Sequence, residues 1–165
     1  MSKGDIEIIE PKVLSTKQFQ VAAGADGTIK AGEPVVCTPG TATVALAADA
    51  TPSVGTDYLI GIATTNSTDT TAAAGVVDVY VLQVGEIISM KAKVAANADT
   101  AAEILAIEND FLLMDLTSEV WTVDVSAGHA IASGLRATGQ GEPENSRVYL
   151  AVRSAATLTG SDIAA

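Results

Sequence analysis

The sequence predicts a mainly β fold, a small β-sandwich or β-barrel in one domain. Short segments rich in Val, Ile, Thr and Tyr recur at intervals of roughly 8–12 residues, with turn signals between them. Several of them alternate apolar and polar residues, the period of a β-strand. Of the 165 residues, 48% are hydrophobic but only 4% aromatic, so the core consists of Ala, Val, Ile and Leu and favours thin, closely packed sheets.

Residues 75–91 are the clearest of these segments. They predict two strands that meet at residues 83–85 as the central hairpin of the fold. Its apolar face is expected in the core and carries three valines: Val77, Val79 and Val81. The opposite face, with Asp78 and Tyr80, is expected at solvent or at a subunit contact.

Residues 1–16 are expected to form an extended arm, and residues 17–165 a single β-rich domain. Four strands are expected, at residues 19–21, 35–37, 41–47 and 58–63. Residues 64–74, rich in Thr and Ala, are expected as an exposed loop.

After the hairpin, residues 92–109 are the one expected helical region. Asp99 is the expected N-cap, and Glu103 suits the positive end of the helix dipole. Strands are expected at residues 111–114, 119–125 and 147–153. Gly139-Gln140-Gly141 predicts turns, and a short polar tail follows from Ser154.

Composition excludes several partners and classes. With 20 acidic and 9 basic residues, the net charge of −11 argues against nucleic acid and against an anionic membrane surface. The acidic N-terminus does not resemble a signal peptide, and no run approaches the ~18 apolar residues of a membrane helix. The single cysteine, Cys37, excludes an internal disulfide and is expected as a buried structural thiol. We expect a protein made and folded in a cytoplasm.

Catalytic equipment is sparse, so we expect no enzyme and no cofactor. His129, the only histidine, has Asp124 and Ser126 or Ser133 nearby, but a triad is a geometry and not a neighbourhood in sequence. A surface or turn histidine is the preferred interpretation.

A cluster of carboxylates raises the question of a metal site. Its members are Glu108, Asp110, Asp115 and Asp124. Because no calcium-loop pattern is present, no metal site is expected, although whether this cluster binds a cation stays open.

The arm carries the most specific functional signal. Its acidic and apolar residues alternate as in a strand, and a terminal strand can add to the sheet of a partner. We expect it to become ordered only by docking. The candidate binding residues are Ser2, Lys3, Asp5, Ile6, Glu7, Ile8, Ile9 and Lys12. Tyr80 and Trp121 are candidate subunit contacts, although a core position is the preferred interpretation for Trp121.

Three further segments resemble the head decoration (capsid cement) proteins of tailed bacteriophages, similar in type to the lambda head decoration protein. The run 29–36 resembles their opening strand, Gly61-Ile62-Ala63 a second strand, and residues 77–87 a hairpin. The resemblance covers about residues 28–91 and continues more loosely in residues 111–125 and 147–153.

This resemblance implies a β-tulip-like protein that binds the outer surface of the expanded capsid and stabilises it. The implied partners are the major capsid protein and two further copies in a homotrimer, with the arm pairing with a capsid strand. The chain is longer than the lambda type and adds the helical segment 99–107. The implied location is the outer surface of the virion.

Other classes remain as alternatives. One alternative is a different structural module of the virion, such as a tail-tube or fibre-base β-domain. A carbohydrate-binding β-sandwich usually presents exposed aromatic rings, which are few here. A small β-barrel hydrolase is disfavoured by the residue inventory.

Overall fold

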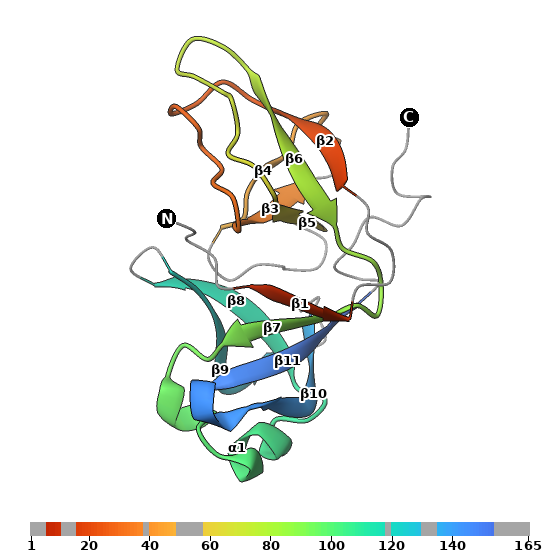
Figure 1. The fold of residues 1–165 in the computed structure, drawn as a ribbon, viewed down its shortest axis with the longest axis vertical. Helices are drawn as coiled ribbons and strands as arrows, with labels where there is room; N and C mark the ends of the chain where they lie inside the picture. Colours follow the sequence, from red (N-terminus) through yellow and green to blue (C-terminus); the bar gives the residue numbers. More distant parts are fainter. Residues whose placement is uncertain are drawn as a thin grey trace.

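The computed structural model describes residues 6–10, 16–37, 40–48, 58–117, 120–129 and 135–153. Within these ranges the chain is mainly β, as the sequence predicts, and forms two antiparallel sheets and one short α-helix (Figure 1).

The six-stranded sheet contains the first strand and most of the second half of the chain. Its strands, in spatial order, are β1 (Glu7–Glu10), β7 (Ile87–Lys91), β11 (Arg147–Val152), β10 (Leu135–Glu142), β8 (Phe111–Thr117) and β9 (Val120–His129). The sheet curls strongly, because a bridge between Ala92 and Val123 brings the end of β7 beside β9. The N–H of Lys93 donates to the Val123 carbonyl over 2.8 Å at the same place.

The five-stranded sheet holds the intervening part of the chain. Its strands, in spatial order, are β2 (Thr16–Val21), β6 (Gly75–Val81), β5 (Tyr58–Ala63), β3 (Pro34–Cys37) and β4 (Ala45–Leu46). This sheet also curls, since Val21 at the end of β2 bridges Val44 beside β4.

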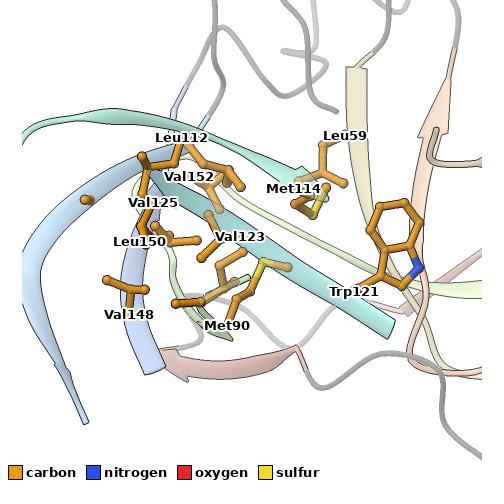
Figure 2. Close-up of a cluster of buried hydrophobic side chains, with 14 of the residues drawn as sticks. Leu59, Met90, Leu112, Met114, Trp121, Val123, Val125, Val148, Leu150 and Val152 are labelled. Atoms are coloured by element: carbon orange, nitrogen blue, oxygen red, sulfur yellow. The ribbon is translucent and has the colours of Figure 1, made fainter. Parts of the chain in front are cut away.

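Two apolar clusters fill the fold. The larger core joins both sheets, with Leu59, Ile62 and Tyr80 of the five-stranded sheet among side chains of the six-stranded sheet. Figure 2 shows Leu59 near Met114 in this core. The smaller core lies on the other face of the five-stranded sheet and includes Val77 and Val79.

The expected central hairpin is wrong, although both of its strands exist. β6 pairs with β2 and β5, whereas β7 pairs with β1 and β11, so residues 75–91 cross from one sheet to the other. The reason is that β6 and the residue after it, Leu82, carry apolar side chains on both faces, so that each face packs in a different core. Val77 and Val79 lie in the smaller core, while Tyr80 and Leu82 lie in the larger one.

The helix is shorter than expected and begins one residue later. After a 3-10 turn at Ala95–Asn97, α1 spans Ala101–Ala106 with Thr100 as its N-cap. Thr100 Oγ1 accepts a bond from the Glu103 N–H (3.3 Å), and Glu103 Oε2 accepts one from the Thr100 N–H (3.0 Å). Because of this reciprocal capping box, Thr100 is the N-cap residue in place of the expected Asp99.

The glycine-rich segment after β9 is a strand, and the turn expected at Gly139-Gln140-Gly141 is wrong. β10 runs through it and pairs with β11, with a register shift between Ala137 and Gly141. Gly139 has a φ of 73°, so these glycines permit a β-bulge. The expected strand at residues 41–47 is reduced to the two residues of β4.

Gly61 offers a test of the close packing between β5 and β6. A Cβ at this position would lie 1.8 Å from the Tyr80 carbonyl oxygen. We expect Gly61→Ala to lower the free energy of unfolding by at least about 3 kcal/mol, because backbone must move to accommodate it. Urea unfolding measures the change.

Gly40→Ala is the matched control, because a Cβ there meets nothing within 4 Å. Its φ of 83° should cost only about 1 kcal/mol. Equal losses in the two variants would contradict the steric explanation.

Candidate attachment surface

The N-terminal strand lies on the open edge of the six-stranded sheet. β1 pairs antiparallel with β7, with Glu7 opposite Ser89 and Ile8 opposite Ile88, and the register shifts between Ile8 and Glu10. The expectation that the arm becomes ordered only on a partner is therefore wrong for Glu7–Glu10. The alternating residues do form a strand, but that strand pairs with β7 of the same chain.

A buried arginine faces this strand. Arg147 is only 4% exposed. Its Nε donates to Ser89 Oγ over 2.7 Å, and its Nη2 donates to the Ser89 carbonyl over 3.0 Å. The same Nη2 lies 3.6 Å from Glu7 Oε2. The Ser89 bonds thus orient the guanidinium toward the Glu7 carboxylate.

The contacts that hold β1 are modest. The Glu7 side chain is 54% exposed, so solvent limits its ion pair with Arg147 to about 0–1 kcal/mol. Ile6 and Ile8 pack against the larger core but are only partly buried. Each contributes about 1 kcal/mol or less, a fraction of the value for full burial. β1 is therefore a weakly attached edge strand.

The candidate arm residues divide into two groups. Ile6, Glu7, Ile8 and Ile9 are the ones that the structure places at this edge. The others lie outside the described residues: Ser2, Lys3, Asp5 and Lys12.

The expectation that Tyr80 is a subunit contact is wrong, because its side chain is buried inside the chain at 6% exposure. Trp121 is 0% exposed, which confirms the preferred core position over a subunit contact. Trp121 lies at the junction of the two sheets (Figure 2). Its Nε1 has no hydrogen-bond partner among the described residues. Because strand alternation assigns a side chain to a face but not the environment of that face, Tyr80 was misplaced.

Tyr80 takes part in a buried polar contact that the sequence did not indicate. Its hydroxyl donates to Glu86 Oε1 over 2.7 Å, and the Gln83 N–H donates to Glu86 Oε2 over 2.7 Å. Burial, and next the Glu86 carboxylate, raise the pKa of Tyr80 to about 12. The sequence signal for this contact is a Glu between two apolar strands, because a buried carboxylate requires hydrogen-bond donors.

A second polar cluster lies under the loop 64–74, where Ser67 and Asp69 are buried although exposure was expected. Asp69 accepts bonds from the Thr28 N–H (3.2 Å), the Thr28 hydroxyl and the Ser67 hydroxyl (2.5 Å). Burial alone would raise the pKa of Asp69, but these donors outweigh it and hold the pKa below its ordinary value. The cluster ties this loop to the turn before Ile29, whose N–H donates to Ser67 Oγ.

Asp115 and Asp124, two of the four carboxylates considered as cation ligands, bond to different partners. Asp115 pairs with Lys93 over 2.6 Å, and Asp124 accepts bonds from the N–H and hydroxyl of Ser126. Within the described ranges no three His, Cys, Asp or Glu side chains gather as a metal site. His129 ends β9 opposite Phe111.

Two remaining expectations concern single residues. Ser133, considered beside His129, lies outside the described residues. Cys37, expected to be buried, is half-buried, with its Sγ 3.9 Å from both oxygens of Thr41. It ends β3, where the sheet no longer covers it fully.

Comparison with known proteins adds no relative: no family model, curated protein or solved structure matches this chain. None of the helices in the described part of the chain is long and apolar enough to cross a membrane.

The Tyr80–Glu86 contact predicts a specific response to alkaline pH. Tyr80→Phe should lower the free energy of unfolding at pH 7 by about 1–3 kcal/mol, because Glu86 loses a donor. A raised pKa favours the protonated phenol in the folded state. The stability that this phenol contributes is therefore complete below pH 10 and is lost as the pH rises through about 12.

The measurement is urea unfolding of both chains between pH 8 and pH 12. The stability gap between them should narrow above pH 10. A gap that stays constant over this range would contradict the role assigned to the Tyr80 hydroxyl.

Proposed function

We propose that this protein is a structural protein of a phage particle, which binds the outer surface of the expanded capsid and stabilises the head. The observation that carries the proposal is the N-terminal strand, an acidic and apolar segment that lies weakly held at an open sheet edge. The resemblance of residues 28–91 to head decoration proteins supports the same function.

The rest of the fold suits a scaffold. Two curled sheets share one core, and the Tyr80–Glu86 and Asp69 contacts fix the crossover and the loop 64–74. A rigid body presents its binding surfaces without a large ordering cost on association. A protein that binds only the assembled shell stabilises it by linkage, and many copies add their contributions.

In this proposal the partner is the major capsid protein, and the arm, residues 1–12, makes the attachment. The protein acts as a homotrimer on the capsid exterior. Its net charge of −11 keeps the free protein soluble and favours a basic surface on the capsid.

The direct test compares particles assembled with and without this protein. Electron microscopy should show surface knobs that disappear when the protein is omitted, and particles lacking it should lose their contents at a lower temperature. Binding to unexpanded shells should be weaker than to expanded ones. If the protein binds neither the unexpanded nor the expanded shell but does bind a soluble ligand, the proposed function is refuted.

Deleting residues 1–5 tests the arm without removing β1. The deletion should leave the unfolding midpoint unchanged and weaken capsid binding by at least about tenfold, since each 1.4 kcal/mol of lost contact changes Kd by that factor. Sedimentation of particles with bound protein gives the affinity.

Removal of residues 161–165, five residues from the other end, is the matched control and should leave the affinity unchanged. If the chain without residues 1–5 binds as tightly as the full chain, attachment does not involve this part of the arm.

A further inference from the structure

The N-terminal strand can leave its sheet without disturbing any other element. Among the described residues, β1 is the first strand and an outer strand of the six-stranded sheet, and β7 is the one strand that pairs with it. Only five residues, 11–15, separate it from β2, which belongs to the other sheet. Release of β1 therefore costs no more than its own contacts.

The site that β1 occupies is formed by elements other than β1. Ser89 on β7 orients the Arg147 guanidinium through two hydrogen bonds. Ile88, opposite Ile8, is fully buried in the larger core. The β7 edge thus offers backbone groups for a strand, a buried cation beside Ser89 and apolar contacts.

The ladder within one chain is irregular on the side of β1 that leads to the connection. The register shifts between Ile8 and Glu10, and Glu10 is the last residue of β1. A strand from a second copy has no five-residue connection to β2 of the chain that it joins, so it can take the same register without that constraint.

We propose that the β7 edge accepts β1 of a second copy of this chain, so that copies associate by exchanging their N-terminal strands. Charge complementarity selects this occupant. The incoming Glu7 carboxylate faces Arg147, and the incoming Ile8 packs against the larger core. In the exchanged form β1 makes the same contacts as within one chain, and residues 11–15 no longer connect it to the chain whose sheet it joins. This is the usual condition for strand exchange.

Single-cysteine chains test the exchange directly. Glu10→Cys and Ile87→Cys are placed separately on a Cys37→Ser background, because residues 10 and 87 are register partners. The two chains are mixed, incubated and oxidised. Since each chain holds one cysteine, a disulfide between position 10 and position 87 forms only between copies.

We expect a band at twice the chain mass on non-reducing gels, with the 10–87 linkage identified by mass spectrometry. Gln20→Cys mixed with Val76→Cys is the matched control, because these register partners join β2 and β6 within one chain. The control mixture should stay monomeric. A third chain carries both Glu10→Cys and Ile87→Cys. If this chain forms the 10–87 linkage within itself while the mixture of single-cysteine chains forms none, the proposal is overturned.

A second measurement covers the case in which a cysteine variant does not fold. Light scattering of the full chain should show its mass rising to a closed oligomer with concentration, and a chain lacking residues 1–10 should remain a monomer. Equal masses for full and truncated chains at every concentration overturn the exchange, and both experiments omit capsids, so this outcome leaves capsid binding unaffected.

Discussion

The buried carboxylate of Glu86 holds the segment through which the chain passes from one sheet to the other. Its two oxygens accept bonds from the Tyr80 hydroxyl and the Gln83 N–H. Next to it, the Gly85 N–H donates to the Val152 carbonyl (2.7 Å), and the Val152 N–H donates to the Glu86 carbonyl (2.9 Å). These bonds join the end of β6 to β7 and β11. Apolar contact between the sheets is non-directional, so these bonds determine how the crossover is placed.

Two other buried polar groups act in the same way at the two ends of the molecule. Asp69 joins the loop 64–74 to the turn at Thr28 in the five-stranded sheet. Arg147 joins β11 to Ser89 on β7 and faces the arm. Asp69 and Arg147 each bond to a residue far away in sequence, 41 and 58 positions respectively, and a buried polar group satisfied in this way favours one structure. A rigid body with one weakly held edge strand follows from this arrangement.

The local elements were largely predictable from the sequence. β5 was expected at residues 58–63 and lies at Tyr58–Ala63, and β11 begins at Arg147 as expected. The strands β8 and β9 also follow from their apolar runs. β10 was missed because its two glycines have low strand propensity, while a bulge in a strand requires residues of that kind. Asp99 is the expected cap because Asp is by itself a better N-cap than Thr, but the reciprocal bonds between Thr100 and Glu103 favour Thr100.

The sequence alone determined the position of most strands, β10 being the main exception, because side-chain alternation is a local property. It also indicated that the arm has the pattern of a strand. Only the tertiary structure decided that β6 and β7 belong to different sheets, that Tyr80 is buried, and that Arg147 faces β1. The physical reason is that pairing depends on contacts between distant residues. Ser89 and Arg147 are 58 positions apart, and no local period in the sequence relates them.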